Sequence, residues 1–316
     1  MSRAPGVAGL VAAAGRSRGA EAAAFAALAV TYGMCRVLPP AVVHGAAALL
    51  GDVAFAILPT RRRLALDNVA HALGGEIGST EIRRIARHSF RSFLLTAMPE
   101  AARLRPHLTG KDARSWLWRR SPELEALFER VKRIHDETGG CIFVTPHLGN
   151  WELLPDVAAA VGVPLVVVAR PLDNRYLERW LAKSRRASGQ TFLAKRNVLL
   201  ALQHHLARGA SLGLLADQLT HRGVAVPFFG RPAPTTPIPA LLAVQHGRPI
   251  VVVACIRTGT LRFSGHLGEP IWPEPHDSEK AEVIRLTSAM NRAMEDVIRR
   301  HPAQYLWMHN RWKSVV

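Results

Sequence analysis

Residues 141–152 read CIFVTPHLGNWE, an apolar run followed by a short polar segment. The apolar run is typical of a buried strand, and the Ala/Val/Leu-rich residues 153–161 that follow are typical of a helix. Pro155 places the start of this helix near Glu152, because proline is tolerated only in the first turn of a helix. We therefore expect a strand, a turn and a helix, with His147 at the end of the strand.

His147 and Glu152 are separated by four residues, and this spacing alone is a weak signal. With 14 His and 24 acidic residues in 316, about one such pair should arise by chance, and two others begin at His71 and His107. Only the pair that starts at His147 stands at the end of an apolar strand. The two side chains can face one site only if a turn separates them, because residues five apart on a continuous helix point about 140° away from each other.

This arrangement suggests acid–base chemistry. A carboxylate is favoured at a helix N-terminus by the helix dipole, so Glu152 can hold the imidazole of His147 in one tautomer. The other ring nitrogen is then free to accept a proton from a hydroxyl. We expect a base and its orienting carboxylate, without a protein nucleophile. The alternative is a strand-end histidine satisfied by local backbone and a glutamate that serves only as a helix-start charge.

The composition indicates a globular protein with an anionic partner. The 316 residues suffice for one large or two small domains, and a hydrophobic content of 48% excludes wholesale disorder. The formal net charge is +17, and 35 of the 41 basic residues are arginine. Such an excess favours nucleic acid, a membrane surface, or an acidic protein or lipid substrate; compositional bias is the alternative.

The cysteines Cys35, Cys141 and Cys255 lie far apart, so we expect reduced core residues and no disulfide. The sequence contains no C-x-x-C and no H-E-x-x-H, so we expect no metal site and no cofactor. It also lacks a G-x-S-x-G motif, which argues against a serine hydrolase. Without an RNP-like motif, a recognition-helix signature or a zinc finger, nucleic acid is not an expected partner.

Residues 7–58 are rich in Ala, Val and Leu and are divided by Pro39-Pro40. Segments 20–38 and 41–58 are each about long enough to cross a bilayer, but both carry charged residues. We interpret them as membrane-embedded or interfacial helices, with a packed helical hairpin as the alternative. The arginine cluster at 61–63 favours the cytoplasmic side of a membrane.

The rest of the chain predicts an α/β fold with a largely parallel sheet flanked by helices. A helical pattern covers residues 80–104. Further on, apolar runs end in Arg170, Asp217 and Arg257, with helical segments between them. Ligands bind at the carboxyl ends of such strands, where these three residues and His147 should gather. We divide the chain into an N-terminal membrane-associated segment (1–58) and a catalytic domain (59–316).

Two aromatic segments lie in the second half of the chain. Phe228 and Phe229 are adjacent and follow Asp217 closely, so they are candidate walls of an apolar channel for an alkyl chain, with ordinary core packing as the alternative. Residues 304–313 combine Tyr, two Trp and two cations, a composition that suits a bilayer interface.

Several motifs occur together in one order. They are residues 147–152 (HLGNWE), 170–174 (RPLDN), 217–218 (DQ), 226–230 (VPFFG) with 235–236 (TT), 304–307 (QYLW) and 311–313 (RWK). In these motifs, from about residue 61 to 313, the sequence resembles the bacterial lipid A biosynthesis acyltransferase family, which includes lauroyl and myristoyl transferases. The resemblance implies a glycerolipid-acyltransferase-like fold.

The resemblance also implies a reaction and roles. An acyl chain would pass from acyl carrier protein or acyl-CoA to a hydroxyl of a phosphorylated glycolipid, most simply a lipid A precursor, at the cytoplasmic face of the inner membrane. His147 would be the general base and Glu152 its orienting carboxylate. Arg170 would hold a phosphate or the developing oxyanion, and Asp217 would support the site. The substrate-binding candidates are Arg170, Asn150, Asp217, Phe228 and Phe229.

Two other functions stay open at this point. One is acylation of a different lipid, such as a phosphatidylinositol mannoside or a lysophospholipid. The other is a basic membrane- or nucleic-acid-binding protein without catalysis, in which His147 would be dispensable.

Overall fold

The computed structural model describes residues 18–97, 99–108, 112–120, 122–169, 172–194, 198–221, 223–275 and 278–312. The helices are α2 (Arg18–Val37), α3 (Pro40–Ile57), α4 (Pro59–Leu73), α5 (Ser79–Ala97), α6 (Pro99–Leu108), α7 (Ala113–Arg120), α8 (Glu123–Thr138), α9 (Leu154–Ala160), α10 (Arg175–Ala187), α11 (Leu199–Ala207), α12 (Ile238–His246) and α13 (Glu279–Arg300). The strands are β1 (Ile142–Thr145), β2 (Leu165–Ala169), β3 (Thr191–Ala194), β4 (Ser211–Leu215), β5 (Val224–Phe228), β6 (Arg231–Thr235), β7 (Ile250–Gly259) and β8 (Arg262–Leu267).

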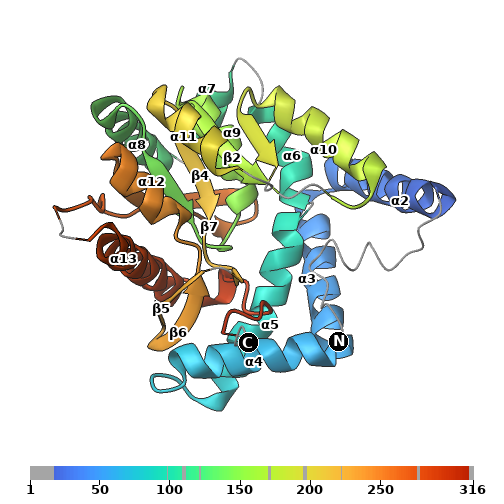
Figure 1. The fold of residues 1–316 in the computed structure, drawn as a ribbon. Helices are drawn as coiled ribbons and strands as arrows, with labels where there is room; N and C mark the ends of the chain where they lie inside the picture. Colours follow the sequence, from blue (N-terminus) through green and yellow to red (C-terminus); the bar gives the residue numbers. More distant parts are fainter. Residues whose placement is uncertain are drawn as a thin grey trace.

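A six-stranded sheet with the order β3-β2-β4-β1-β7-β8 forms the centre of the molecule (Figure 1). Its neighbouring strands are parallel except for β8, which pairs antiparallel with β7 at one edge. Strands β5 and β6 make a separate antiparallel hairpin. The predicted α/β fold with a largely parallel sheet is therefore confirmed.

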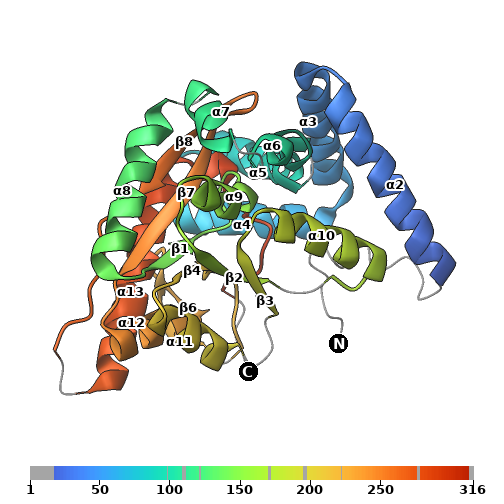
Figure 2. The same ribbon diagram turned by 90° about the horizontal axis from the view of Figure 1, so that it is seen from above.

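Helices cover both faces of the sheet because side chains alternate along each buried strand. Ile142 and Val144 of β1 face a core that also contains residues of α5, α11, α12 and α13. Cys141 and Phe143 face a second core with residues of α6, α8 and α9. Figure 2 shows the two helical layers on opposite sides of the strands.

The register between β1 and β4 determines which residues meet at the carboxyl edge. These parallel strands pair Thr145 with Leu215. His147 and Asp217 each follow two residues later, so the chain leaves both strands at the same level of the sheet. The helix after β1 begins as expected, with a single 3₁₀ turn at Trp151–Leu153 that leads into α9.

Helices α2 and α3 confirm the two predicted apolar helices, and both are attached along the α/β domain. In the middle of α3, Asp52 binds Arg87 and Arg91 of α5, with oxygen–nitrogen distances of 2.5 to 2.7 Å. Near the start of α2, Glu21 pairs with Arg175 of α10 at 2.9 Å. Both helices therefore lie along the surface of the domain.

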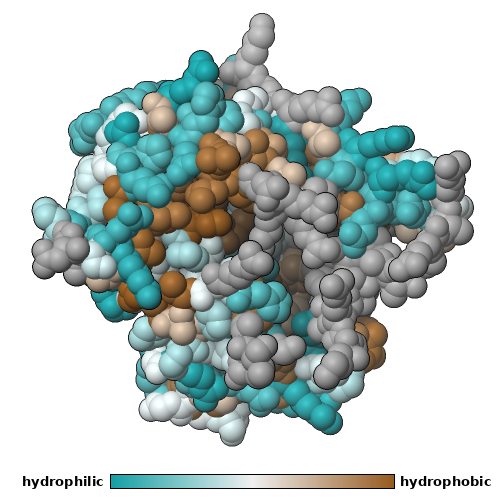
Figure 3. All heavy atoms as spheres, viewed as in Figure 1, coloured by the Kyte–Doolittle hydropathy of each residue, from teal (hydrophilic) through white to brown (hydrophobic). Residues whose placement is uncertain are grey.

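The exposed surface has two hydrophobic regions. In the view of Figure 3, hydrophobic residues gather around α11 and α12, whereas the surface over α10 is hydrophilic. Most of the large hydrophobic side chains that are individually exposed belong to α2, α3 and the turn between them: Val30, Met34, Val37, Leu38, Val42, Leu49, Leu50, Val53 and Ile57.

Two expectations from the sequence are wrong in detail. The helical pattern over residues 80–104 forms two helices, α5 and α6, because Pro99 starts a new helix. The C-terminal aromatic residues Tyr305 and Trp307 lie in the core and do not face outward, since they are 4% and 1% exposed. Their rings pack against each other at 4.8 Å beneath the carboxyl edge of the sheet.

Candidate active site

The imidazole of His147 is held by Asp217. Its Nδ1 atom lies 2.6 Å from one carboxylate oxygen, and its backbone N–H donates to the other oxygen over 2.8 Å. This double contact follows from the pairing of β1 with β4, which brings the two strand exits together. The Asp217 side chain is 2% exposed and the His147 side chain 15% exposed, so the imidazole retains one accessible edge.

The neighbours of His147 favour one tautomer. A carboxylate can only accept, so the proton belongs on Nδ1. On the other side of the ring, the amide nitrogen of Gln218 lies 3.1 Å from Nε2. Gln218 is exposed and donates to the Nε2 lone pair, the position that a substrate hydroxyl would take. Nε2 is thereby prepared to accept a proton.

Asp217 is ionised in spite of its burial. Burial alone would raise the pKa of this carboxyl, but His147 and the hydrogen bonds that it donates bring the pKa below its usual value. Tyr305 also hydrogen-bonds Asp217, and burial followed by this carboxylate raises the pKa of the tyrosine well above its ordinary range. His309 lies nearby, and burial lowers its pKa to about 4.

Glu152 occupies a different place from the one predicted. Its carboxylate pairs with Arg105 of α6 at 3.3 Å, and Arg105 also reaches Asp156 at 3.2 Å. The contact that the sequence assigned to Glu152, the orienting carboxylate on the imidazole, is made by Asp217. The 3₁₀ turn at Trp151–Leu153 directs Glu152 toward α6, and Asp217 already fills the Nδ1 side of His147.

The backbone after His147 is fixed from two directions. The Gly149 N–H donates to the Gln304 carbonyl over 3.2 Å, and the Asn150 N–H donates to the Cys255 carbonyl of β7 over 2.8 Å. Gly149 has φ +60°, and a Cβ atom there would lie 2.0 Å from the Cys255 oxygen. Only glycine fits this approach of the loop to β7.

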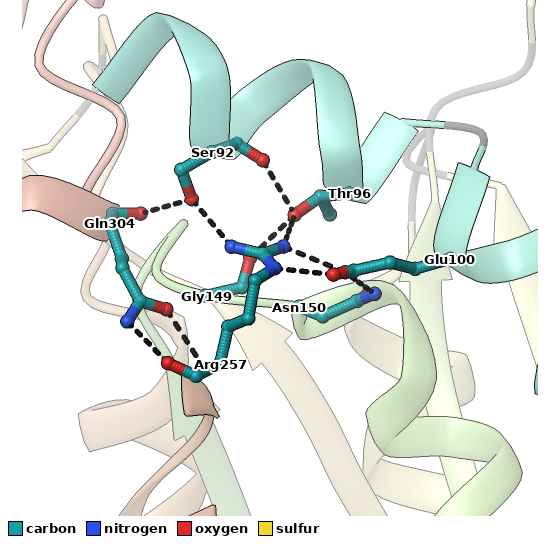
Figure 4. Close-up of polar contacts among 7 residues, drawn as sticks. All are labelled: Ser92, Thr96, Glu100, Gly149, Asn150, Arg257 and Gln304. Carbon is teal, nitrogen blue, oxygen red and sulfur yellow. Dashed lines mark hydrogen bonds and ion pairs between the residues drawn. The ribbon is translucent and has the colours of Figure 1, made fainter. Parts of the chain in front are cut away.

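A buried ion pair braces the same loop (Figure 4). The Arg257 guanidinium binds the carboxylate of Glu100, which is 0% exposed, through Nε and through Nη2, the latter at 2.7 Å. Glu100 in turn accepts from the Asn150 amide at 2.6 Å. Arg257 also donates to Ser92 and Thr96 of α5, each at 3.0 Å, and Thr96 donates to the Gly149 carbonyl at 2.6 Å. Gln304 closes the network by exchanging two hydrogen bonds with the Arg257 backbone.

The remaining predicted site residues do not gather around His147. Asn150 is fully buried and turned toward Glu100. Phe228 and Phe229 pack edge to face at 4.9 Å in the core, and neither lines the apolar cavity beside Trp151. Arg170 lies outside the described residues. In the described part of the chain, no three His, Cys, Asp or Glu side chains gather as metal ligands.

An apolar cavity lies next to Trp151. Trp151 contacts the His147 ring at a centroid distance of 5.1 Å and contributes to the wall of this cavity. The cavity lies on the α8–α9 side of the sheet, and residues that line it include Phe143, Leu104, Trp116, Leu124, Phe128 and Phe263. Its apolar walls suit an alkyl chain.

Sequence reasoning missed several residues of the site. Gln218 was visible as the neighbour of Asp217, but its contact with His147 depends on the strand pairing. Glu100, Ser92 and Thr96 fall in an ordinary helical pattern, and no local signal marks them. Tyr305 belongs to a recognised motif, although its aromatic neighbours suggested a surface role.

The buried ion pair predicts a strong double-mutant coupling. Glu100→Gln and Arg257→Met should each lower the free energy of unfolding by about 3–5 kcal/mol, because each leaves its partner as an uncompensated buried charge. The double variant should lose clearly less than the sum of the two. Chemical denaturation of all four proteins measures this coupling. Additive losses would show that the pair does not act as a unit.

His309 predicts a dependence of stability on pH. Its folded pKa is about 4, so below pH 6.5 the unfolded chain takes up a proton that the folded chain does not. This costs up to about 3 kcal/mol between pH 7 and pH 4. His309→Gln should therefore flatten the loss of stability in this window, whereas His221→Gln, at an exposed histidine, is the control. Equal slopes for wild type and His309→Gln would refute the assignment.

Comparison with known proteins identifies the family of the chain. The model of the family "Bacterial lipid A biosynthesis acyltransferase" matches residues 18–314. The phosphatidylinositol mannoside acyltransferase of Mycolicibacterium smegmatis is 27% identical over 183 residues, which are 56% of this chain and 58% of that protein. The lipid A biosynthesis palmitoleoyltransferase of Escherichia coli is 27% identical over 212 residues, which are 63% of this chain and 66% of that protein.

A phosphatidylinositol mannoside acyltransferase of Mycobacterium tuberculosis is 26% identical over 179 residues, which are 55% of this chain and 54% of that protein. The matched regions thus span between about half and two thirds of the relatives' own length. The family match is broader, since it covers nearly all of the described residues. The chain therefore belongs to the bacterial lipid A biosynthesis acyltransferase family.

Proposed function

We propose that this protein transfers a fatty acyl chain from a thioester to a hydroxyl of a glycolipid, with His147 as the general base. The observation that carries the proposal is the His147–Asp217 pair, in which Nδ1 is bound at 2.6 Å and Nε2 faces an accessible edge. The family supports acyl transfer as the reaction. The apolar cavity beside Trp151 supplies a place for the acyl chain.

In this mechanism Nε2 of His147 takes the proton of the acceptor hydroxyl while its oxygen attacks the thioester carbonyl. Asp217 stabilises the imidazolium that forms, without itself taking the proton. When the tetrahedral intermediate collapses, the carbon–sulfur bond breaks and the thiolate leaves with the proton held by His147. The products are an ester and a free thiol, so no cofactor enters the balance. Arg170 remains our candidate for the phosphate or the oxyanion, because guanidinium binds phosphate through two donors.

The donor and acceptor follow from charge and family. A net charge of +17 favours encounter with an acidic acyl carrier protein, although acyl-CoA fits the same chemistry. A lipid A precursor is the acceptor that we favour, because the family and the relative from Escherichia coli bear that name. A phosphatidylinositol mannoside is the second candidate, because two other relatives are named for it.

We further propose that α2 and α3 rest on the cytoplasmic face of the inner membrane. The exposed hydrophobic side chains of these helices supply the contact, and the length and hydropathy of both helices are compatible with lipid. The ion pairs of Asp52 and Glu21 attach them along the α/β domain, which supports an interfacial position over a spanning one.

The catalytic assignment predicts a ranking of variants. His147→Ala should lower kcat by about 10²- to 10⁴-fold, because the base is lost. Asp217→Asn should lose nearly as much, since an amide can hold the wrong tautomer. Glu152→Gln should lose less, because its partner is Arg105. Steady-state assays on folded variants test the ranking, and wild-type turnover by His147→Ala would end the mechanism.

The substrate assignment is tested by offering purified protein a labelled acyl carrier protein or acyl-CoA of equal chain length. Acceptors are a lipid A precursor, its dephosphorylated form, a phosphatidylinositol mannoside and a lysophospholipid, with products identified by mass spectrometry. We expect carrier-dependent acylation of the phosphorylated lipid A precursor, weakened by salt. Preference for acyl-CoA at all salt concentrations, or no effect of removing the phosphate, would contradict this assignment.

The proposed contact of α2 and α3 with the membrane predicts how salt and substitutions change membrane binding. High salt should loosen but not release it, because each cation contributes only about 1 kcal/mol near an anionic surface. Leu49→Gln/Leu50→Gln should weaken vesicle binding about tenfold or more, since buried leucine contributes about 1.5–3 kcal/mol. Ile284→Gln on α13 is the control. Complete release by salt, or equal losses in both variants, would contradict the proposed surface.

A further inference from the structure

A second cavity lies between the α2–α3 turn and α6. Its volume is about 380 Å³, within the range of about 300–1,000 Å³ found for small-molecule sites. Arg36 at the end of α2 and Pro40 at the start of α3 line it, together with Arg103 and His107 of α6 and Trp116 of α7. It meets the apolar cavity only through shared walls at Leu104, Trp116 and Leu261.

The charge in this cavity is unbalanced. Arg103 Nε and Nη2 are buried and have no hydrogen-bond partner within the described part of the chain. Among the described residues, no Asp or Glu forms an ion pair with Arg103, and the residues that line the cavity include no acidic side chain. By contrast, Arg257 in the loop network pairs with the buried carboxylate of Glu100. Arg103 as a whole is half-buried, and a partly buried guanidinium without a carboxylate partner favours the binding of an anion.

The other lining side chains suit a phosphate ester. Arg36 brings a second guanidinium, and guanidinium groups bind phosphate through two parallel hydrogen bonds. The His107 ring stacks on Trp116 at 4.5 Å with an interplanar angle of 5°, which holds its ring in the wall of the cavity. Two arginines and a histidine thus surround a space large enough for a small headgroup.

The surroundings of the cavity favour a lipid as the ligand that carries the phosphate. The α2–α3 turn that lines it also carries Val37 and Leu38, which are 85% and 37% exposed, and Val42 follows at 53%. If a ligand placed its phosphate in the cavity, the part of the ligand outside the cavity would therefore lie beside exposed apolar side chains. This combination fits a lipid with an anionic headgroup better than a soluble phosphate.

We propose that this cavity is a binding site for the phosphate headgroup of an anionic membrane lipid, with Arg103 and Arg36 as its ligands. The site is separate from the reacting groups, because Arg105, two residues along α6, is turned toward Glu152 and Asp156. A lipid bound here would hold the α2–α3 turn against α6 and supply the counterion that Arg103 lacks.

The test measures lipid binding without turnover, so it is independent of the acyl-transfer proposal. Full-length protein in neutral detergent is titrated calorimetrically with short-chain phosphatidylglycerol below its micelle concentration, with short-chain phosphatidylcholine and with inorganic phosphate. We expect one phosphatidylglycerol per protein, with the other two binding at least about tenfold more weakly. Inorganic phosphate binding as tightly as phosphatidylglycerol would overturn the lipid assignment.

Variants distinguish lipid binding by these arginines from a purely structural role. Arg103→Gln and Arg36→Gln should each weaken phosphatidylglycerol binding about tenfold or more, whereas Arg208→Gln, at the exposed arginine that directly follows α11, should not. Without lipid, Arg103→Gln should unfold at the same temperature as wild type or higher, because an unpaired buried charge is removed. Unchanged lipid affinity in Arg103→Gln, or equal weakening in Arg208→Gln, would overturn the proposal.

Discussion

The parallel pairing of β1 with β4 is the constraint on which the site depends. Thr145 stands opposite Leu215, so the two chains leave the sheet side by side and His147 meets Asp217 over both its ring and its backbone N–H. A shift of the register by one residue would turn every side chain of β1 to the other face. It would expose Ile142 and Val144 to the wrong core and separate the imidazole from its carboxylate. Core packing and the geometry of the candidate site are therefore fixed by the same interaction.

Helix α5 connects this edge of the sheet with the proposed membrane surface. On one side it holds Asp52 of α3 through Arg91, and its next residue, Ser92, reaches Arg257 within the loop network. Thr96, one turn later, holds the Gly149 carbonyl. Because α5 is one continuous helix over these residues, α3 and the His147 loop are parts of one packed assembly. A lipid acceptor bound along α3 would therefore be linked through α5 to the loop that carries His147.

Much of the fold could be predicted from the sequence because its signals are local. The apolar runs that end in Arg170 and Asp217 marked β2 and β4, and Pro155 marked the helix after His147. The orienting carboxylate could not be found in this way. Asp217 is 70 residues from His147, and only the order of the strands brings them together, whereas Glu152 was close in sequence and of the right chemical type. The buried C-terminal aromatics show the same limit, since composition does not tell whether Tyr305 faces lipid or supports Asp217.

In the proposed mechanism, Asp217 holds the proton of His147 on Nδ1 and leaves Nε2 as the base. The most direct test is nitrogen NMR on protein labelled with ¹⁵N-histidine at neutral pH, with the His147 signals assigned by comparison with His147→Gln. We expect the Nδ1–H tautomer to dominate in the wild type and no longer to dominate in Asp217→Asn, whereas Glu152→Gln should keep the wild-type pattern. A proton on Nε2 in the wild type, or a tautomer that responds to Glu152→Gln and not to Asp217→Asn, would contradict this mechanism.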